Sequence, residues 1–235
     1  MNKQVEQGDI IIKKMHEHYL DRWLKLYDLD EYKQWLFCGL MKLLKKYTKK
    51  GTVLEIGCSK GYFTNMLSRN GYHAIGSDIS LTALRAAAKI ERTRLDGEML
   101  PFKNDAFDAV LAVYTIEHMP KPGKCLDEIF RVLKQKKPFI AVTPDKESFL
   151  TKVGFHLVRY TSLKNPYHVG LMSRKDLEKS METSGFGSFV LLPFHNGFLG
   201  APFLKSFLRK EFIPIPLSTN VLLPFSHHQL IVALK

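Results

Sequence analysis

The sequence predicts an α/β fold in which a mainly parallel sheet carries helices on both faces. Two observations predict it: short apolar segments alternate with amphipathic ones between residues 52 and 144, and the overall composition is that of an ordinary globular protein. Hydrophobic residues make up 45% and charged residues 25% of the 235 positions. Strands that alternate with helices imply right-handed crossover connections and therefore parallel neighbours. We expect one domain over residues 1–235.

Residues 1–50 are predicted to form helices that precede the first strand. Apolar residues recur there at three- and four-residue steps between Ile10 and Tyr47. Such spacing places them on one face of a helix. The segment 28–30 is expected to divide the stretch into two helices.

Residues 51–144 contain five predicted strands with helices between them. The strands are expected at 52–56, at 73–76, directly before Asp96, at 107–113 and at 138–142, and the helices at 62–69, 81–90 and 125–134. Ser80 is predicted to cap the helix over 81–90, because a serine hydroxyl accepts a hydrogen bond from an unpaired backbone amide of the first turn.

The C-terminal part continues the alternation less regularly. Ser173 is expected to open a helix over 174–183 that Gly185 ends, and strands are predicted at 189–192 and 229–234. Two segments do not fit the pattern: 145–172, which holds Pro, Gly and histidines, and 194–224, which is rich in Phe and Pro. We interpret both as insertions within the single domain.

The formal net charge of +12 raises the question of a nucleic-acid partner. The excess of basic over acidic residues is +4 in residues 1–50 (11 against 7), +3 in 51–144 (13 against 10) and +5 in 145–235 (11 against 6). The charge is therefore spread along the chain rather than gathered in a patch. Nucleic acid remains an alternative partner that the sequence does not indicate.

Cysteine and apolar content narrow the class of protein further. The three cysteines have no paired spacing, which argues against a disulfide framework and a cysteine zinc site. The apolar runs are too short to cross a bilayer, and the N-terminal residues show no cleavage site. We expect a cytoplasmic protein.

The segment VLEIGCSKGYF, residues 53–63, joins a strand to a helix through two glycines. Glycines allow a ligand to approach the main chain, and a helix N-terminus offers free amides, so this arrangement is typical of nucleotide binding. The spacing fits neither the dinucleotide fingerprint nor the Walker loop. Glu55 would repel a pyrophosphate and favour a cationic ligand, and S-adenosylmethionine is the nucleoside that suits it best.

Acidic residues after the next two strands complete a nucleoside site. Asp78 is placed to accept hydrogen bonds from both ribose hydroxyls, and Ile79 to lie against the adenine face. Asp96 is placed to accept from the adenine amine, and the amide of Gly97 to reach a ring nitrogen. Ligands of open α/β sheets bind at the carboxyl ends of the strands, where all of these residues are expected.

With these residues the sequence resembles the class I S-adenosylmethionine-dependent methyltransferases, most closely the branch that includes the ubiquinone and menaquinone C-methyltransferases. The matching motifs are EIGCSKG at 55–61, GSDIS at 76–80, DGEMLPF at 96–102, FDAV at 107–110 and EHM at 117–119. The resemblance implies a Rossmann-like seven-stranded sheet with an antiparallel last strand, and a cofactor-binding half over 51–144.

The resemblance also implies the cofactor and its contacts. Glu55, Gly57 and Gly61 surround the methionine end of S-adenosylmethionine, and the main chain near Val113 meets its amino group. The full predicted cofactor-binding set is Glu55, Gly57, Cys58, Ser59, Gly61, Asp78, Ile79, Asp96, Gly97, Glu98, Val113 and Tyr114. Cys58 is interpreted as a small filler of the loop, not as a nucleophile.

Catalytic groups are expected beside the predicted methyl position. The candidates are His118, Tyr114 and His168, with Glu117 next to them. A base is needed only where the acceptor must lose a proton. The structural alternatives are that His118 caps a helix, that Glu117 pairs with a lysine and that Tyr114 only lines the pocket.

We predict no metal site from the histidine spacing. His16 and His18 lie on different sides of a helix, and His227 and His228 on opposite faces of a strand, so we expect surface histidines.

The segment 198–212 indicates the acceptor class. Its apolar residues share one helical face and its basic residues flank them, which suits a bilayer surface or the roof of an apolar pocket. A helix packed on its own domain is the plainer interpretation. We expect a small apolar or aromatic acceptor and allow peripheral membrane contact through 198–212. The alternatives are an RNA (tRNA) or protein methyltransferase and a non-catalytic cofactor-binding scaffold.

Overall fold

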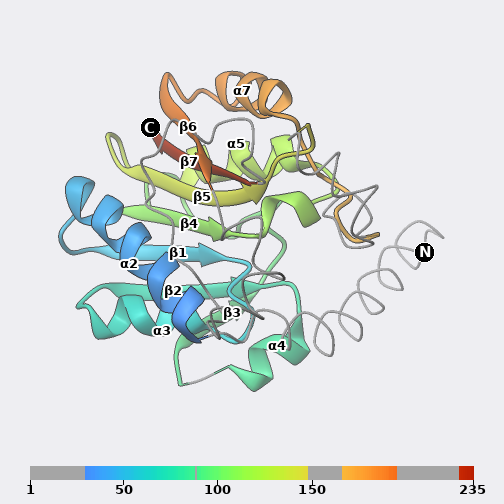
Figure 1. The fold of residues 1–235 in the computed structure, drawn as a ribbon. Helices are drawn as coiled ribbons and strands as arrows, with labels where there is room; N and C mark the ends of the chain where they lie inside the picture. Colours follow the sequence, from blue (N-terminus) through green and yellow to red (C-terminus); the bar gives the residue numbers. More distant parts are fainter. Residues whose placement is uncertain (1–29, 88, 148–165, 195–227) are drawn as a thin grey trace, which may run out of the picture.

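A single seven-stranded sheet runs through the computed structural model, which describes residues 30–87, 89–147, 166–194 and 228–235 (Figure 1). The strand order is β3-β2-β1-β4-β5-β7-β6. The strands are β1 (Thr52–Ile56), β2 (His73–Asp78), β3 (Glu91–Arg94), β4 (Ala109–Val113), β5 (Pro138–Pro144), β6 (Ser188–Phe194) and β7 (His228–Leu234).

The sheet is parallel except at β7. The pairs β1–β2, β1–β4, β2–β3 and β4–β5 are parallel, whereas β7 runs antiparallel to both β5 and β6. This confirms the predicted Rossmann-like sheet with its antiparallel last strand.

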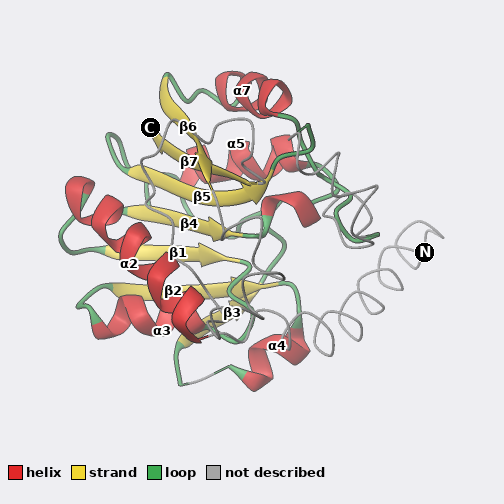
Figure 2. Ribbon diagram, in the orientation of Figure 1, coloured by secondary structure: helices red, strands yellow, loops and turns green. Residues whose placement is uncertain are grey.

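Helices cover both faces of the sheet, as Figure 2 shows. The helices are α2 (Asp30–Tyr47), α3 (Tyr62–Arg69), α4 (Leu81–Ala86), α5 (Pro122–Val132) and α7 (Arg174–Thr183), with one 3-10 turn, η1 (Ile116–His118). Helices α2 and α3 pack on one face, and α5 and α7 on the other. The helix α4 lies beside β2 and β3 at the edge of the sheet.

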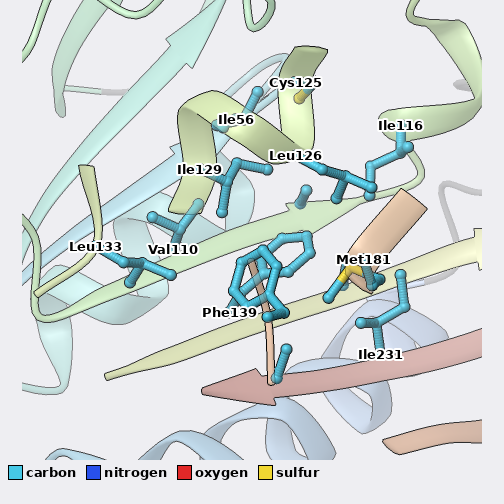
Figure 3. Close-up of a cluster of buried hydrophobic side chains, with 14 of the residues drawn as sticks. Ile56, Val110, Ile116, Cys125, Leu126, Ile129, Leu133, Phe139, Met181 and Ile231 are labelled. Atoms are coloured by element: carbon cyan, nitrogen blue, oxygen red, sulfur yellow. The ribbon is translucent and has the colours of Figure 1, made fainter. Parts of the chain in front are cut away.

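Alternation along the strands produces two separate cores. Val110 and Ala112 of β4 face α5 and α7, whereas Ala109, Leu111 and Val113 face α2 and α3. Figure 3 shows the first of these cores, in which Leu126 and Ile129 of α5 lie over the sheet. Both faces of β4 are buried, which is why this strand is apolar at every position.

Local chemistry fixes several of the predicted helix ends. Helices α3 and α7 have the predicted bounds, and the Ser80 hydroxyl accepts from the Ala83 amide at 3.0 Å. The prediction of a helix as far as residue 90 is wrong, because Ala87 is extended and the chain must enter β3 at Glu91 to pair with β2. Pairing in the sheet overrides the helix preference of the intervening alanines.

Other predicted bounds shift by one to three residues. The helix α5 begins at Pro122 instead of residue 125, since proline is well suited to the first helical position. The strand β4 begins two residues later than predicted. Asp108 instead accepts from the Thr52 amide through its side chain at 3.0 Å, and Phe107 pairs with Leu133.

Several predictions fall on residues that the structure does not describe. They are the helix before residue 28, most of the insertion at 145–172, and all but the first residue of the insertion at 194–224, with its amphipathic segment 198–212. The division of the chain into one domain with two insertions therefore stays a prediction. Within the described ranges, no helix has the length and apolar character that a membrane span requires.

Candidate active site

The carboxyl ends of the central strands meet at one edge of the sheet. Ile56 at the end of β1 lies beside Ser77 of β2 on one side and Ala112 of β4 on the other. Since these strands are parallel and their ends are aligned, the loops that follow them lie together. The edge therefore gathers the residues that the sequence predicted as ligand contacts.

The glycine loop between β1 and α3 has an unusual backbone. Gly57, Ser59 and Gly61 all adopt left-handed conformations, with φ of 73°, 49° and 75°. At Gly57 a Cβ would lie 2.2 Å from the Thr115 hydroxyl oxygen, so only glycine fits without displacement. The Cys58 amide donates to the Ser77 carbonyl at 2.8 Å, which joins the loop to β2.

Asp78 holds the loop from the end of β2. Its Oδ2 accepts from the Ser59 amide at 2.9 Å, and its Oδ1 accepts from the Ser80 amide at 2.8 Å. The sequence predicted a ligand contact here, and the structure adds the role of fastening the loop.

Glu55 lies buried below the loop on the α3 side of the sheet. The hydroxyl of Thr64 in α3 donates a short hydrogen bond to its Oε2. Burial raises the pKa of Glu55 to about 7. Sequence analysis missed Thr64; the available signal was a polar residue on the same helical face as the buried Leu67.

Cys58 is held as a neutral thiol. It is buried, and burial raises its pKa well above the usual range for cysteine. The thiolate is the nucleophilic form, so this cysteine is inert. The structure thus agrees with its interpretation as a loop filler.

The segment after β3 is a tight turn. The Glu98 amide donates to Asp96 Oδ1 at 2.9 Å, and a Cβ on Gly97 would lie 2.6 Å from Met119 Cε. The Glu98 carboxylate accepts from the Lys121 amide at the start of α5. Asp96 is exposed, whereas the side chain of Glu98 is engaged in joining the turn to α5. Ile79, on the neighbouring turn, is partly buried, and its carbonyl accepts from Arg94 at 3.0 Å.

Tyr114, directly after Val113, has a left-handed backbone with φ of 54°. A bulky residue in this conformation costs roughly 1–2 kcal/mol, and such strain concentrates at functional sites. Its amide donates to Val142 at 2.8 Å, and its ring meets that of His228 edge-on at 5.3 Å between centroids. The expectation of a surface histidine is wrong for His228, which is buried because β7 lies inside the sheet.

Glu117 of η1 is almost completely buried, with 1% of its surface exposed. The Thr143 hydroxyl of β5 donates to its Oε2 at 3.1 Å. The hydrogen-bond partner of Glu117 is thus a threonine, whereas the structural alternative considered from the sequence was a lysine. Burial raises the pKa of Glu117 to about 8.

His118 and His168 lie against each other although 50 positions separate them. Their ring centroids are 4.8 Å apart. The Nδ1 of His118 donates to the Tyr167 carbonyl at 2.9 Å, because a carbonyl can only accept. Burial lowers the pKa of His118, so the ring is neutral near pH 7.

The segment 166–172, which carries His168, is docked on η1. The Gly170 amide donates to the Glu117 carbonyl at 2.9 Å. A Cβ at Gly170 would lie 2.1 Å from the Met119 carbonyl oxygen, so this close approach requires glycine. The two segments are thus joined on both sides of His168.

Thr115 connects the two halves of the edge. Its hydroxyl lies 3.1 Å from the Ile56 carbonyl, to which it donates, and it contacts the glycine loop. One half consists of the glycine loop with Glu55 and Asp78. The other consists of Tyr114, the η1 residues Glu117 and His118, and His168 of the docked segment. The cofactor contacts predicted for these residues remain predictions.

Comparison with known proteins identifies the family. A family described as "Methyltransferase domain" matches residues 29–187, about two thirds of the chain. A protein of Mycolicibacterium smegmatis named as a probable S-adenosylmethionine-dependent methyltransferase is 30% identical over 138 residues, which are 57% of this chain and 51% of that protein. A demethylmenaquinone methyltransferase of Clavibacter sepedonicus is 30% identical over 89 residues, or 35% and 36%.

The similarity covers only part of these relatives. The matches span between about half and two thirds of the first curated relatives. A crystal structure from Thermotoga maritima, described as a possible histamine N-methyltransferase, superimposes with a TM-score of 0.65 and 22% identity over 96% of this chain and 98% of that one. At this identity the likeness shows the fold. Fold and family match agree: this chain belongs to the class I S-adenosylmethionine-dependent methyltransferases, whose cofactor is S-adenosylmethionine.

Proposed function

We propose that this protein transfers the methyl group of S-adenosylmethionine to a small apolar or aromatic acceptor. The observation that carries the proposal is the meeting, at one sheet edge, of the loop that Asp78 fastens with the strained Tyr114 and with η1, whose His118 lies against His168. The first half offers groups that suit a nucleoside, and the second offers groups that suit an acceptor.

The donor set fits the cofactor. Asp78 is a carboxylate at the end of β2, a group that accepts hydrogen bonds from ribose hydroxyls, and the loop beside it has a left-handed backbone at Gly57, Ser59 and Gly61. Glu55 supplies a carboxylate close below the loop, where an ammonium group would favour its ionised form. Asp96 and the Gly97 amide would hold the adenine, and the main chain at Val113 the amino group.

When bound, S-adenosylmethionine supplies a methyl group already activated by its positive sulfur. The chain's own task is then to align the acceptor and to exclude water. Tyr114, His118 and His168 are the side chains that we propose to contact the acceptor. Since Nδ1 of His118 donates to the Tyr167 carbonyl, the ring N–H lies on Nδ1 and the ring lone pair on Nε2.

Two observations support an apolar acceptor. One relative carries the name demethylmenaquinone methyltransferase, which denotes an apolar quinone acceptor. The segment 198–212 has the basic amphipathic pattern that suits a lipid-like molecule or a bilayer surface.

The first experiment measures cofactor binding by titration calorimetry with S-adenosylhomocysteine. We expect Asp78→Asn to weaken binding about tenfold to a hundredfold, because hydrogen bonds to a charged group contribute about 1.5–3 kcal/mol each. Glu178→Gln is the matched control, since Glu178 is an acid on α7 paired with Arg174, and should bind as the unaltered protein does. Absence of heat with the unaltered protein would refute the proposal.

The second experiment identifies the acceptor class. Phenols, isoprenoid quinones, tRNA and basic proteins are each incubated with labelled S-adenosylmethionine, and label transfer is measured. Transfer to phenols or quinones is expected. Transfer to tRNA or protein alone would contradict the acceptor class, and binding without transfer to any of them would indicate a scaffold.

A further inference from the structure

Glu117, His118 and His168 form a compact group whose potential ligand atoms all lie within 4.8 Å of one another. We propose that this group binds a divalent transition metal ion of the zinc class. The sequence did not predict the site. The closely spaced histidine pairs lie elsewhere in the chain, and His168 is far from the other two residues in the sequence.

The distances suit a metal after a small closure. Zinc binds imidazole nitrogen and carboxylate oxygen at about 2.0–2.2 Å, so neighbouring donors of a tetrahedral site lie roughly 3.4 Å apart. The donor atoms lie within 4.8 Å of one another, so the side chains need to close by at most about 1.4 Å.

The surroundings of His118 and Glu117 resemble those of metal ligands. Histidines that bind metals usually donate their second N–H to a carbonyl or carboxylate, which fixes the tautomer and aims the other nitrogen. His118 donates in this way to Tyr167 at 2.9 Å. Ligating carboxylates are likewise held by hydrogen bonds, as Glu117 is by Thr143 at 3.1 Å.

Charge favours a cation at the same place. Glu117 is 1% exposed, and a cation bound beside it would stabilise its carboxylate form, which burial otherwise disfavours. None of the ion pairs found in the described part of the chain includes Glu117. A bound metal ion would supply that positive charge.

The ligand set indicates the metal. Two imidazoles and one carboxylate are a known zinc set for sites that keep a fourth position open. Oxygen-only sites suit magnesium and calcium, and thiolate sites suit copper(I), so neither class fits this group as well.

The backbone holds the site together. The segment 166–172 is bound to η1 through Tyr167 on one side of His168 and through Gly170 on the other. In the chain, η1 begins two residues after Tyr114.

The open coordination position of the metal ion indicates an acceptor class, and this step rests on the proposed function. An acceptor hydroxyl bound there has a lowered pKa, since a metal ion stabilises the oxyanion. The O–H bond breaks and the proton passes to water. The oxygen then forms a bond to the methyl carbon, the carbon–sulfur bond breaks, and the sulfur keeps the electron pair. Phenols and enols are thus the acceptors expected.

The test titrates Zn²⁺ into the full chain, purified with a chelator and without a histidine tag, in the absence of acceptor. We expect one ion per chain, and Co²⁺ in its place should give the intense visible absorption of a four- or five-coordinate site. Glu117→Gln and His168→Ala should each weaken Zn²⁺ binding at least tenfold and reduce the Co²⁺ absorption.

The matched control is His73→Ala. His73 pairs with Glu91 at 2.7 Å on the surface, so it is a histidine–glutamate pair outside the cluster. It should bind Zn²⁺ as the unaltered chain does. Circular dichroism checks the fold, and His168→Asn replaces His168→Ala if the latter does not fold.

Two outcomes would overturn the metal site: no Zn²⁺ binding, or binding that Glu117→Gln and the His168 variant leave unchanged. Titration with S-adenosylhomocysteine separates this result from the proposed function. If that ligand binds while Zn²⁺ does not, the metal site fails and the methyltransferase proposal stands.

Discussion

At the scale of single residues, buried acids set the chemistry of the edge. Glu55 is enclosed between the glycine loop and α3, with the Thr64 hydroxyl as its partner, and burial raises its pKa to about 7. In the free protein this raised pKa lowers stability as pH rises from 4.5 to about 7. The unfolded chain loses the proton first and therefore gains the advantage in that interval.

Glu55 should make cofactor affinity depend on pH. An ammonium group near the loop favours the ionised carboxylate, so below pH 7 binding must first release the proton. We expect affinity for S-adenosylhomocysteine to fall by up to tenfold per pH unit below about 7 and to level off above it. Calorimetry between pH 5.5 and 8.5 measures this.

Two variants test the assignment to Glu55. Glu55→Gln should flatten the pH profile, whereas Glu91→Gln, an exposed acid of β3, should keep it. A profile that persists in Glu55→Gln would show that another group titrates.

At the scale of elements, the glycine loop and η1 shape each other. Thr115 at the start of η1 fills the space beside Gly57, and its hydroxyl ties η1 to the end of β1. The left-handed backbone of the loop and the position of η1 are therefore coupled. A substitution that changes the loop backbone should therefore also shift η1.

Gly57→Ala should lower the free energy of unfolding by about 3 kcal/mol or more. Alanine there meets both a left-handed backbone, which costs about 1–2 kcal/mol, and an overlap with Thr115. Urea unfolding measures the loss.

Gly71→Ala separates these two costs. Gly71 also has a positive φ, of 84°, but nothing lies within 4 Å of its added Cβ, so it should lose only about 1–2 kcal/mol. The double variant with Thr115→Ala should recover part of the Gly57→Ala loss. Equal losses at the two glycines would contradict the overlap.

At the scale of the whole molecule, stability and function lie in different places. The core between the sheet and the helices α5 and α7 includes Phe186, whose ring lies 5.1 Å from that of Phe130 and 5.9 Å from that of Phe139. Phe186 follows α7, and neither of these two rings belongs to the carboxyl edge of β1 and β2. The core supports the sheet, and the loops at one end carry the ligand groups.

Phe186→Ala should therefore destabilise the protein without altering its site. We expect a loss of about 3–5 kcal/mol in the free energy of unfolding, because a buried phenylalanine leaves a cavity. Affinity for S-adenosylhomocysteine in the folded protein should stay within about twofold. Leu192→Ala, at a side chain 37% exposed, is the control and should lose less than about 1.5 kcal/mol. A large loss of affinity in Phe186→Ala would show that core and site are coupled.

The sequence predicted the sheet, the order of its motifs and the cofactor family, because each of these depends on residues that are close together in the sequence. Alternating apolar segments predict strands and helices, and a glycine loop after a strand needs no distant partner to be recognised. Helix ends were predicted where a capping residue decides them, as at Ser173, and missed where sheet pairing decides them, as after Ala86.

Only the tertiary structure decided which side chains meet. His118 and His168 are neighbours because the segment 166–172 docks on η1, and Glu55 meets Thr64 because α3 packs over β1. Such contacts depend on how the crossover connections return the chain to the sheet. A local sequence pattern does not predict this. The cofactor edge is thus a property of local sequence, and the Glu117–His118–His168 group is a property of the fold.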